Sequence, residues 1–416
     1  MYMINQKEAA KYIYDFIVEI IDKHGPRLPG SEEEAASVKD IKAHMYAATG
    51  VKPKVEEFKL APTASIGAIP MLGAAGMVSL ALYYLHPAAS LVASFMVLAY
   101  AIIQVFLYRG WFDRFFKQHT SHNIYSVMDG GKDIDYTIVF SGHYDSSWNW
   151  NMSLKHPLMM IPKTVYGVVG VVVVLVASLL RLILGMGSLS NTSLFFIITP
   201  LCFIPGLCFL CYYLSYDKKK ASPGAMDDLT GVGMALYMGK YYRENPDKLP
   251  KNCRVIVAAL GSEEAGLKGS MAFMDKHADD KNLLINPYFI NLDSLRDYDN
   301  FNAVKGDSWQ FTKFDNDMCN MVVKAFENAG VKPHVISNPV GGCDSTPIVK
   351  KGFKTITIAA QTPTATNYYH TYNDKPEGLD MRTLEKSVGI IIDVAEQIGE
   401  HHANNEYKLV KYKKSK

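Results

Sequence analysis

Two adjacent glutamates, Glu263 and Glu264, follow Cys253–Leu260, an apolar, β-branched run that predicts a buried strand. Residues 265–277 then predict a helix. Carboxylates at the end of a buried strand are costly unless a partner needs them. Because adjacent side chains point in different directions, one glutamate can bind a metal ion while its neighbour transfers a proton. The plainer alternative is a solvated helix N-terminus, where acidic residues suit the helix dipole.

Four further segments place similar residues after expected strands or in a turn. They are Gly142–Asp145 after the strand Tyr136–Ser141, the acidic turn Gly224–Gly231, Asp293 after the strand Tyr288–Leu292, and the loop Tyr368–Asp374 after the strand Lys354–Ala359. Each alone has a plainer explanation as a helix cap, a turn residue or a surface histidine. The carboxyl ends of parallel strands meet at one edge of a sheet. Together the segments predict a cluster of His143, His370 and several carboxylates.

Imidazole and carboxylate ligands suit zinc, with cobalt or manganese as possible substitutes. Two divalent cations fit the set, because three ligating carboxylates and a bridging hydroxide would balance their charge. Paired metals about 3.5–4 Å apart hold and deprotonate a water while they polarise a carbonyl. The sequence therefore predicts a centre for two zinc ions.

The composition of the chain bears on two questions: whether nucleic acid is a partner, and whether the cellular compartment is reducing. The 416 residues carry a formal net charge of +2, which gives no reason to expect nucleic acid as a partner. The six cysteines include no CxxC pair, a pattern typical of free thiols in a reducing compartment. Residues 1–11 have no apolar core of the signal-peptide type.

Four apolar stretches interrupt the polar chain: Ala64–Leu85, Ala88–Tyr108, Thr164–Leu180 and Thr192–Tyr216. They have roughly the 20 residues that an α-helix needs to cross a bilayer, and they predict two transmembrane hairpins. The hairpin tips carry no lysine or arginine, apart from Arg181 close to one of them, whereas positive residues flank the other ends. By the positive-inside rule, the polar part of the chain faces the cytoplasm. Arg181 is expected to extend to the bilayer surface.

Strands that alternate with helices predict an α/β fold with a mostly parallel mixed sheet between helices. Further expected helices are 7–23, a helix from the Ser31/Glu34 capping box to residue 50, 229–242, 315–329 and 381–401. Residues 55–60 are expected to form an edge strand. The hairpins are expected to be insertions into this one domain.

The motifs as a set resemble those of the M28 family of co-catalytic zinc peptidases. The matching segments are His143–Asp145, Gly224–Gly231, Glu263–Ser270, Asn291–Asp293 and His370–Asp374, and Gly25–Ser31 is similar to the family's N-terminal segment. The likeness covers nearly all of the polar chain and none of the four apolar stretches.

The resemblance implies a role for each residue. Asp227 would bridge two zinc ions. His143 and Asp293 would complete one metal site, and Glu264 and His370 would complete the other. Glu263 would be the general base. Asp145 would orient His143, and Asp228 and Asp374 would support the ligands; Asp228 occupies the position after the bridging acid, where a strained peptide bond is expected.

The resemblance also implies the fold of the zinc exopeptidases. Residues 1–63, 109–163 and 217–416 would form the peptidase domain. The implied activity is that of an aminopeptidase, which hydrolyses N-terminal residues of peptides with a water held between the metals. The apolar stretches, which the resemblance does not cover, make residues 64–108 and 164–216 the two transmembrane hairpins that anchor the enzyme. The expected partners are peptide substrates and the lipid bilayer.

Residues beside the motifs are candidates for a substrate pocket: Trp148, Trp150, Tyr368, Tyr369 and Asp344. The two tryptophans fit the bilayer interface equally well. Cys343-Asp344-Ser345 departs from the Ser-Asp-His-like stretch that the family often has, which leaves the role of this loop open.

Other activities stay open at the level of sequence. Carboxypeptidase and dipeptidase activities occur among relatives, and glutaminyl cyclases, which use a single zinc, share the His-Tyr-Asp-Ser stretch. A catalytically silent, receptor-like homologue is a further alternative, against which the complete ligand set and Glu263 argue. A transporter with an accessory peptidase domain is another, but the nearly uncharged spans offer no ion path.

Overall fold

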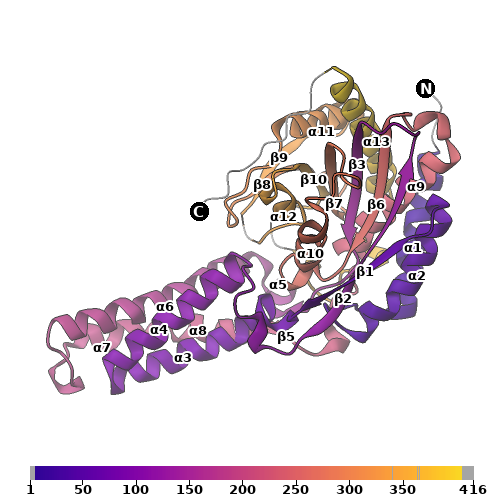
Figure 1. Cartoon of the computed structure of the whole chain (residues 1–416). Coiled ribbons are helices and arrows are strands. Elements are labelled where there is room, and N and C mark those ends of the chain that lie inside the picture. Colours follow the sequence, from indigo (N-terminus) through magenta and orange to yellow (C-terminus); the bar gives the residue numbers. More distant parts are fainter. Residues whose placement is uncertain (1–4, 340, 363, 365, 405–416) are drawn as a thin grey trace.

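An eight-stranded mixed sheet forms the centre of the α/β domain in the computed structural model, which describes residues 5–339, 341–362, 364 and 366–404 (Figure 1). The strands are β1 (Lys54–Leu60), β2 (His119–Asp129), β3 (Tyr136–His143), β6 (Cys253–Leu260), β7 (Pro287–Leu295), β8 (Phe301–Asp307), β9 (His334–Asn338) and β10 (Lys354–Ala360). Their order across the sheet is β1-β2-β6-β3-β7-β10-β8-β9. The central strands β6, β3, β7 and β10 are parallel to one another. The predicted α/β class with a mostly parallel mixed sheet is confirmed.

Helices cover both faces of the sheet. The helices of the α/β domain are α1 (Gln6–His24), α2 (Glu32–Thr49), α5 (Asn151–Lys155), α9 (Thr230–Glu244), α10 (Lys268–His277), α11 (Asn316–Asn328), α12 (Ser345–Lys350) and α13 (Met381–Asn404). The capping box of α2 is half realised, because Ser31 accepts a hydrogen bond from Glu34 N at 3.1 Å whereas the Glu34 carboxylate bonds to Gly30 N.

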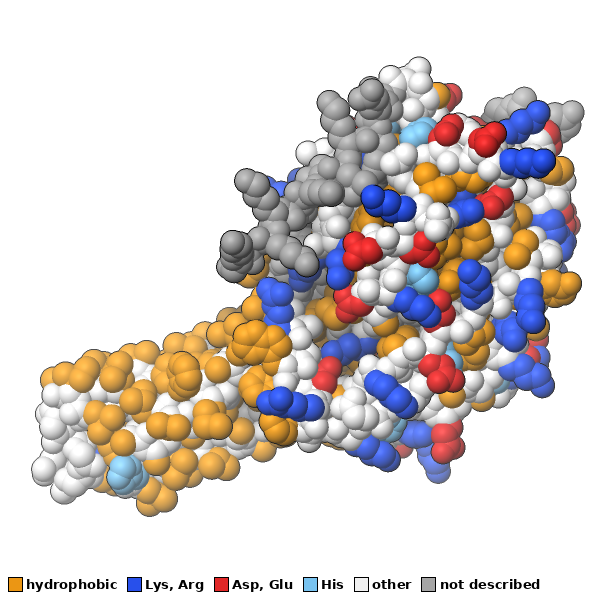
Figure 2. All heavy atoms as spheres, in the orientation of Figure 1, with side chains coloured by type: hydrophobic (Ala, Val, Ile, Leu, Met, Phe, Trp, Pro, Cys, Tyr) orange, Lys and Arg blue, Asp and Glu red, His pale blue; other side chains and the backbone are white. Residues whose placement is uncertain are grey.

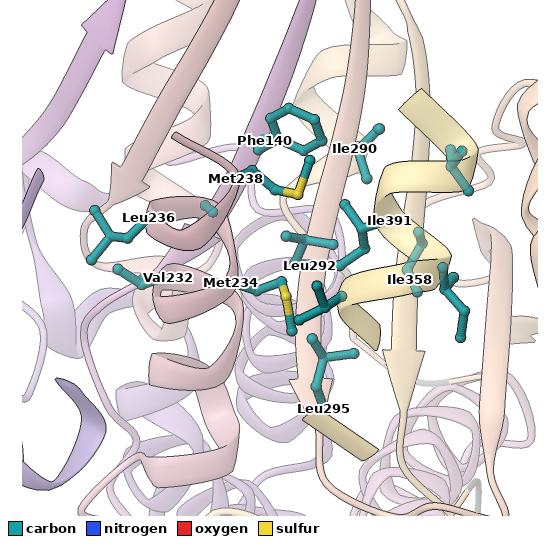
Figure 3. Close-up of a cluster of buried hydrophobic side chains, with 14 of the residues drawn as sticks. Phe140, Val232, Met234, Leu236, Met238, Ile290, Leu292, Leu295, Ile358 and Ile391 are labelled. Carbon is teal, nitrogen blue, oxygen red and sulfur yellow. The ribbon is translucent and has the colours of Figure 1, made fainter. Parts of the chain in front are cut away.

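The two faces of the sheet carry separate apolar cores because side chains alternate along each strand. On one face, Phe140, Ile290 and Leu292 meet Met234 and Met238 of α9, and Ile391 of α13 packs beside them (Figure 3). On the other face, Val139 and Ile256 pack against Phe273 of α10 and Ile348 of α12. These two layers fix the strand ends that carry the polar motifs.

Apolar helices form an arm that extends from one end of the α/β domain (Figure 1). They are α3 (Ile69–Leu85), α4 (Pro87–Tyr100), α6 (Met160–Ile183), α7 (Leu194–Leu201) and α8 (Ile204–Cys211). Within the described residues, four helical segments are long and apolar enough to cross a membrane: Ile66–Leu85, Pro87–Phe106, Pro157–Ile183 and Leu194–Cys211. Figure 2 shows the arm as an almost entirely apolar surface, with lysine and arginine side chains near its junction with the domain.

Small residues let the helices of the arm approach closely. A Cβ atom on Gly206 would lie 2.9 Å from the Gly167 Cα, and a Cβ atom on Gly73 would lie 2.5 Å from the Cys211 N. Close backbone contact of this kind replaces the hydrophobic effect as a source of packing energy inside lipid. Arg181 is fully buried, and it donates hydrogen bonds to the carbonyls of Tyr83 and of Met186 at the tip of the second hairpin.

A two-stranded ribbon closes the base of the second hairpin. Its strands are β4 (Asn149–Trp150) and β5 (Leu214–Ser215), with Asn149 opposite Ser215 and Trp150 opposite Leu214. The chain therefore leaves the α/β domain and returns to it at one place.

Candidate active site

The candidate residues gather at the carboxyl ends of the central strands. His143 ends β3, Asp293 lies near the end of β7, and Glu263 and Glu264 follow β6. Asp227 lies in the turn before α9, and His370 lies in the loop after β10. Because the strands are parallel, these ends share one edge of the sheet.

Two groups of potential metal ligands share Asp227. His143, Asp227 and Asp293 each offer a ligand atom, and these three atoms lie within 4.8 Å of one another; the same holds for Asp227, Glu264 and His370. Asp227 Oδ1 lies 3.0 Å from His143 Nε2, and Asp227 Oδ2 lies 3.0 Å from His370 Nε2. One carboxylate thus faces an imidazole of each group.

The chemistry of the site fits divalent cations. Glu264 Oε1 is buried without a hydrogen-bond partner, although it lies 3.3 Å from His370 Nε2. A buried acceptor without a partner in a native fold points to an ion or a water at that place. Two imidazoles and three carboxylates are ligands that zinc accepts. The residues therefore fit zinc, with three candidate protein ligands in each group.

Burial shapes the protonation of the carboxyl groups. It raises the pKa of Glu263 and Glu264 well above the ordinary value, and with the charge of Asp227 it raises the pKa of Asp293 to about 7. Burial also acts on Asp227, but hydrogen bonds with His143 and His370 outweigh it and bring the pKa of Asp227 below its ordinary value. So many buried carboxyl groups need compensating positive charge, which bound cations would supply.

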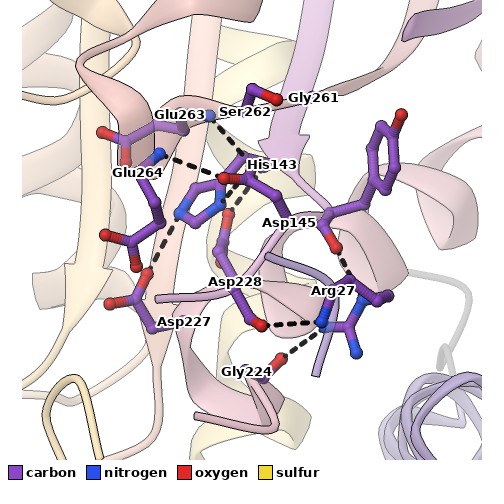
Figure 4. Close-up of polar contacts among 12 residues, drawn as sticks. Arg27, His143, Asp145, Gly224, Asp227, Asp228, Gly261, Ser262, Glu263 and Glu264 are labelled. Atoms are coloured by element: carbon purple, nitrogen blue, oxygen red, sulfur yellow. Dashed lines mark hydrogen bonds and ion pairs between the residues drawn. The ribbon is translucent and has the colours of Figure 1, made fainter. Parts of the chain in front are cut away.

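Asp145 connects a histidine to the Glu263-Glu264 turn. Its Oδ1 accepts a hydrogen bond from Glu263 N at 2.9 Å, and its Oδ2 accepts one from Glu264 N at 3.1 Å. The same Oδ1 lies 3.3 Å from His143 Nδ1 (Figure 4). Asp145 thus fixes both the imidazole ring and the backbone that carries the two glutamates.

Asp228 and Asp374 hold the backbone around Asp227. Asp228 accepts hydrogen bonds from His143 N at 3.1 Å, from Gly231 N at 2.9 Å and from Ser294 N at 3.2 Å. Asp374 accepts hydrogen bonds from Met226 N at 2.8 Å and from Asp227 N at 3.2 Å. The peptide bond between Asp227 and Asp228 is cis. Both residues act on ligand positions through the main chain.

Residues 215–395 match the sequence profile of peptidase family M28. This segment, which contains Asp227, Glu263, Glu264, Asp293 and His370, is similar to the M28 peptidases. A comparison with curated protein sequences gives no match.

Solved structures share the fold of this chain at low sequence identity. A zinc aminopeptidase from Bacillus subtilis is 17% identical, with a TM-score of 0.56 over 98% of this chain and 96% of that one. A glutaminyl cyclase from an Acidobacteriales bacterium is 14% identical, with a TM-score of 0.54 over 94% and 95%. A zinc-dependent exopeptidase from Parabacteroides distasonis is 14% identical, with a TM-score of 0.53 over 92% and 97%. At these identities the likeness concerns the fold.

Two buried ionisable residues of the α/β domain support the site without having been predicted. Arg27 donates hydrogen bonds to the carbonyls of Tyr144 at 2.7 Å, Pro223 at 3.0 Å and Gly224 at 3.3 Å, so it joins the turn after β3 to the turn before α9 (Figure 4). Burial lowers the pKa of its guanidinium to about 10. The only sequence signal for Arg27 is its place in the family-like segment Gly25–Ser31.

Glu34 is the second such residue. Its Oε1 accepts hydrogen bonds from the hydroxyls of Ser121 and Ser262, both at 2.8 Å, and its Oε2 accepts one from Gly30 N at 2.7 Å. These bonds tie α2 and β2 to the backbone just before Glu263. Burial raises the pKa of Glu34 to about 8.

A cavity of about 530 Å³ opens over the candidate site. All six predicted ligand and base residues line it: His143, Asp227, Glu263, Glu264, Asp293 and His370. Of the predicted pocket residues, Trp150 and Tyr369 line the cavity. Trp150 meets the His370 ring edge to face at 4.2 Å, and Tyr369 stacks on the same ring at 3.9 Å.

The other predicted pocket residues lie outside the wall of the cavity. Trp148 is buried in the apolar cluster at the base of the arm, which also excludes an exposed position at the bilayer interface. Tyr368 lies against Arg296, whose Cζ is 3.3 Å from the ring centroid, and donates a hydrogen bond to Asp297. Asp344 is fully buried. The backbone of its neighbour Cys343 bonds to Asp307 at 3.0 Å.

Proposed function

We propose that this protein is a membrane-anchored exopeptidase that uses two zinc ions and acts as an aminopeptidase, which removes N-terminal residues from peptides. The observation that carries this proposal is the position of Asp227, whose two carboxylate oxygens each lie 3.0 Å from a different imidazole. A single zinc ion would engage only one of the two histidines in this way. The M28 profile and the fold of the zinc aminopeptidases support the same function.

The protein's own residues supply the proton transfers. Bound zinc would polarise the scissile carbonyl and make a water acidic. Glu263 lines the same cavity as the ligands and is not needed as one, so its carboxylate is free to act as the general base. It takes a proton from the attacking water and gives it to the nitrogen of the breaking C–N bond. Asp145 holds Glu263 in place through its backbone N–H.

The arm is proposed to anchor the enzyme in a bilayer, with the α/β domain on the cytoplasmic side. Four segments are long and apolar enough to span it. Lysines and arginines flank the base of the arm, and by the positive-inside rule they stay in the cytoplasm. Peptides and lipid are therefore the expected partners.

Cleavage assays on the purified full chain test the proposal. The substrates are peptides with a free N-terminus, the same peptides with a blocked N-terminus, dipeptides, and a peptide with N-terminal glutamine, each with zinc and after chelation. We expect cleavage of free N-termini only, lost on chelation and in Glu263→Gln. Release of C-terminal residues, cleavage of dipeptides alone, or cyclisation of the glutaminyl peptide would instead assign a carboxypeptidase, a dipeptidase or a cyclase. A zinc-loaded protein that converts none of the substrates would favour a binding protein.

A further inference from the structure

The cavity over the candidate site continues between the membrane helices. Its wall includes residues from both hairpins: Ile66, Ile69, Leu72, Val97, Leu98, Ala101, Val105 and Phe106 from the first, and Ile161, Thr164, Val165, Val168, Val169, Val171 and Leu210 from the second. Tyr108, at the end of the first hairpin, lines it as well. The arm therefore forms part of the same space as the catalytic residues.

This part of the cavity is apolar. Thr164 is the one polar side chain among the described residues of the four spans that line it. Val165 and Val169 line the cavity although 52% and 40% of their surface is exposed.

The part of the wall that the α/β domain contributes is more polar than the part between the helices. It includes Asn302, Ser337, Asn338, Gln361 and Thr362, together with apolar residues such as Val304 and Ile336. A molecule that fills the cavity thus meets only apolar side chains and Thr164 between the helices, and meets polar side chains and the catalytic residues over the sheet.

We propose that the enzyme hydrolyses amides whose acyl side carries a long hydrocarbon chain, and that this chain lies between the membrane helices during the reaction. The proposal rests on the proposed zinc-dependent hydrolysis. Water adds to the amide carbonyl, the C–N bond breaks, and a long-chain carboxylic acid and an amine leave, with the proton passing from water to the amine. The amine side lies on the more polar part of the wall.

A hydrocarbon chain suits the apolar part better than a peptide chain does. Each residue of a peptide brings an N–H and a C=O group, which lose free energy when they are buried without partners. The span residues of the described wall offer one side-chain partner, Thr164. Each methylene group moved from water into such a space strengthens binding about fourfold. Binding should therefore rise with chain length until the cavity is full.

A series of amides tests this proposal on the full chain in nanodiscs of phosphatidylcholine. The acyl groups are 2-amino fatty acids of four to sixteen carbons, with glycine as the leaving amine, so that every substrate keeps a free α-amine. A matched series lacks the α-amine, and a leucine-rich peptide represents apolar peptides. We expect kcat/KM to rise at least tenfold between the shortest and the longest acyl group.

Two valines of α6 provide a matched pair of variants. Val169 lines the cavity and Val172 does not, yet 40% and 39% of their surfaces are exposed. We expect Val169→Trp to reduce the ratio of long-chain to short-chain kcat/KM at least tenfold, and Val172→Trp to leave this ratio unchanged. Both variants are assayed in the same bilayer, so the partitioning of each substrate into lipid is the same for both. A difference between their ratios therefore comes from the protein. Zinc content and the melting temperature show whether each variant is folded.

Cleavage of the short substrates without dependence on chain length would overturn the proposal and leave the proposed aminopeptidase standing. Equal ratios in the two tryptophan variants would also overturn it. A Val169→Trp defect confined to the leucine-rich peptide would assign the apolar part to peptides. If the unaltered, zinc-loaded protein cleaved none of the substrates, including the short ones with a free N-terminus, the proposed function itself would be overturned.

Discussion

Asp227 faces His143 with one carboxylate oxygen and His370 with the other, at 3.0 Å in both cases. The two histidines come from different strand ends, and Asp293 and Glu264 each join one of them to complete a group of three ligands. This arrangement divides the site into two halves that meet at a single carboxylate.

The two halves should lose metal independently. We expect about two zinc ions per chain in the unaltered protein, about one in His143→Ala or His370→Ala, and less than one in Asp227→Ala, because only the last change affects both halves. Metal analysis of protein purified in excess zinc measures this. His156→Ala, at an exposed histidine away from the site, serves as the control. Retention of two ions in Asp227→Ala would contradict the assignment.

Substitutions of Glu263 and Glu264 should have different effects, one on the catalytic rate and the other on metal binding. Glu263→Gln is expected to keep its zinc and to lose a factor of about 10²–10⁴ in kcat, the usual size of a general-base contribution. Glu264→Gln is expected to lose zinc from one half of the site. Measuring kcat and zinc content on the same preparations checks both. If Glu263→Gln lost metal and Glu264→Gln did not, the two roles would be reversed.

Asp145→Asn should weaken the site without removing a ligand. The amide has one acceptor oxygen where the carboxylate has two, so one of the bonds to Glu263 N and Glu264 N is lost. Changes in groups that orient metal ligands typically cost about 10–100-fold in affinity or activity. Competition with a zinc chelator measures the affinity. An unchanged zinc affinity together with unchanged kcat would show that Asp145 does not position the site.

Glu34 should make stability depend on pH. Its folded-state pKa of about 8 lies above the ordinary 4.5, so the folded protein holds a proton that the unfolded chain releases. The contribution of this group to stability is therefore present at low pH and is lost as pH rises through about 8. Glu34→Gln, which stays neutral, is expected to gain melting temperature relative to the unaltered protein between pH 5 and 8.5. Glu33→Gln, at the neighbouring residue that pairs with Lys218, should show no such trend. A pH-independent difference for Glu34→Gln would refute the assignment.

Cysteine labelling tests the proposed orientation of the arm. A cysteine in place of Ser188, at the tip of the second hairpin, is expected to react with a membrane-impermeant maleimide in intact cells. A cysteine in place of Lys219, at the base, is expected to react only after lysis. The unaltered chain gives the background from its own cysteines. The opposite pattern would place the α/β domain outside the cytoplasm.

The parts of the fold that the sequence predicted are those with uninterrupted local patterns. The strands β3 and β6 each contain an unbroken apolar run, Ile138–Phe140 and Val255–Leu260, and α1 and α13 repeat apolar residues at helical spacing. The strand β2 was missed because its buried positions include polar residues: Asn123 bonds to Gly269 O at 2.8 Å, and Ser121 bonds to Glu34. Buried polar residues that form hydrogen bonds in the folded state interrupt the alternation of apolar and polar residues by which a strand is predicted.

The candidate site also has a part that could be predicted from local sequence and a part that could not. Its candidate ligands lie in short motifs at the ends of expected strands, so the sequence alone predicts them. Arg27 and Glu34 bond to residues more than 80 positions away, and such contacts exist only after the chain has folded. The shared cavity depends on how the hairpins pack against the α/β domain, which the sequence does not show. The sequence also does not show which aromatic side chain faces the cavity, so the prediction that Trp148 lines it was wrong.

The two hairpins precede Asp227, Glu264, Asp293 and His370 along the chain. The ribosome therefore makes all the apolar helices before four of the five candidate metal ligands. The β4–β5 ribbon brings the chain back to its point of departure, so the later strands can join β3 once the second hairpin is in place. If the arm enters a bilayer during synthesis, as proposed, the chain is anchored before the candidate metal centre is complete, and hydrolytic capacity arises only on the anchored protein.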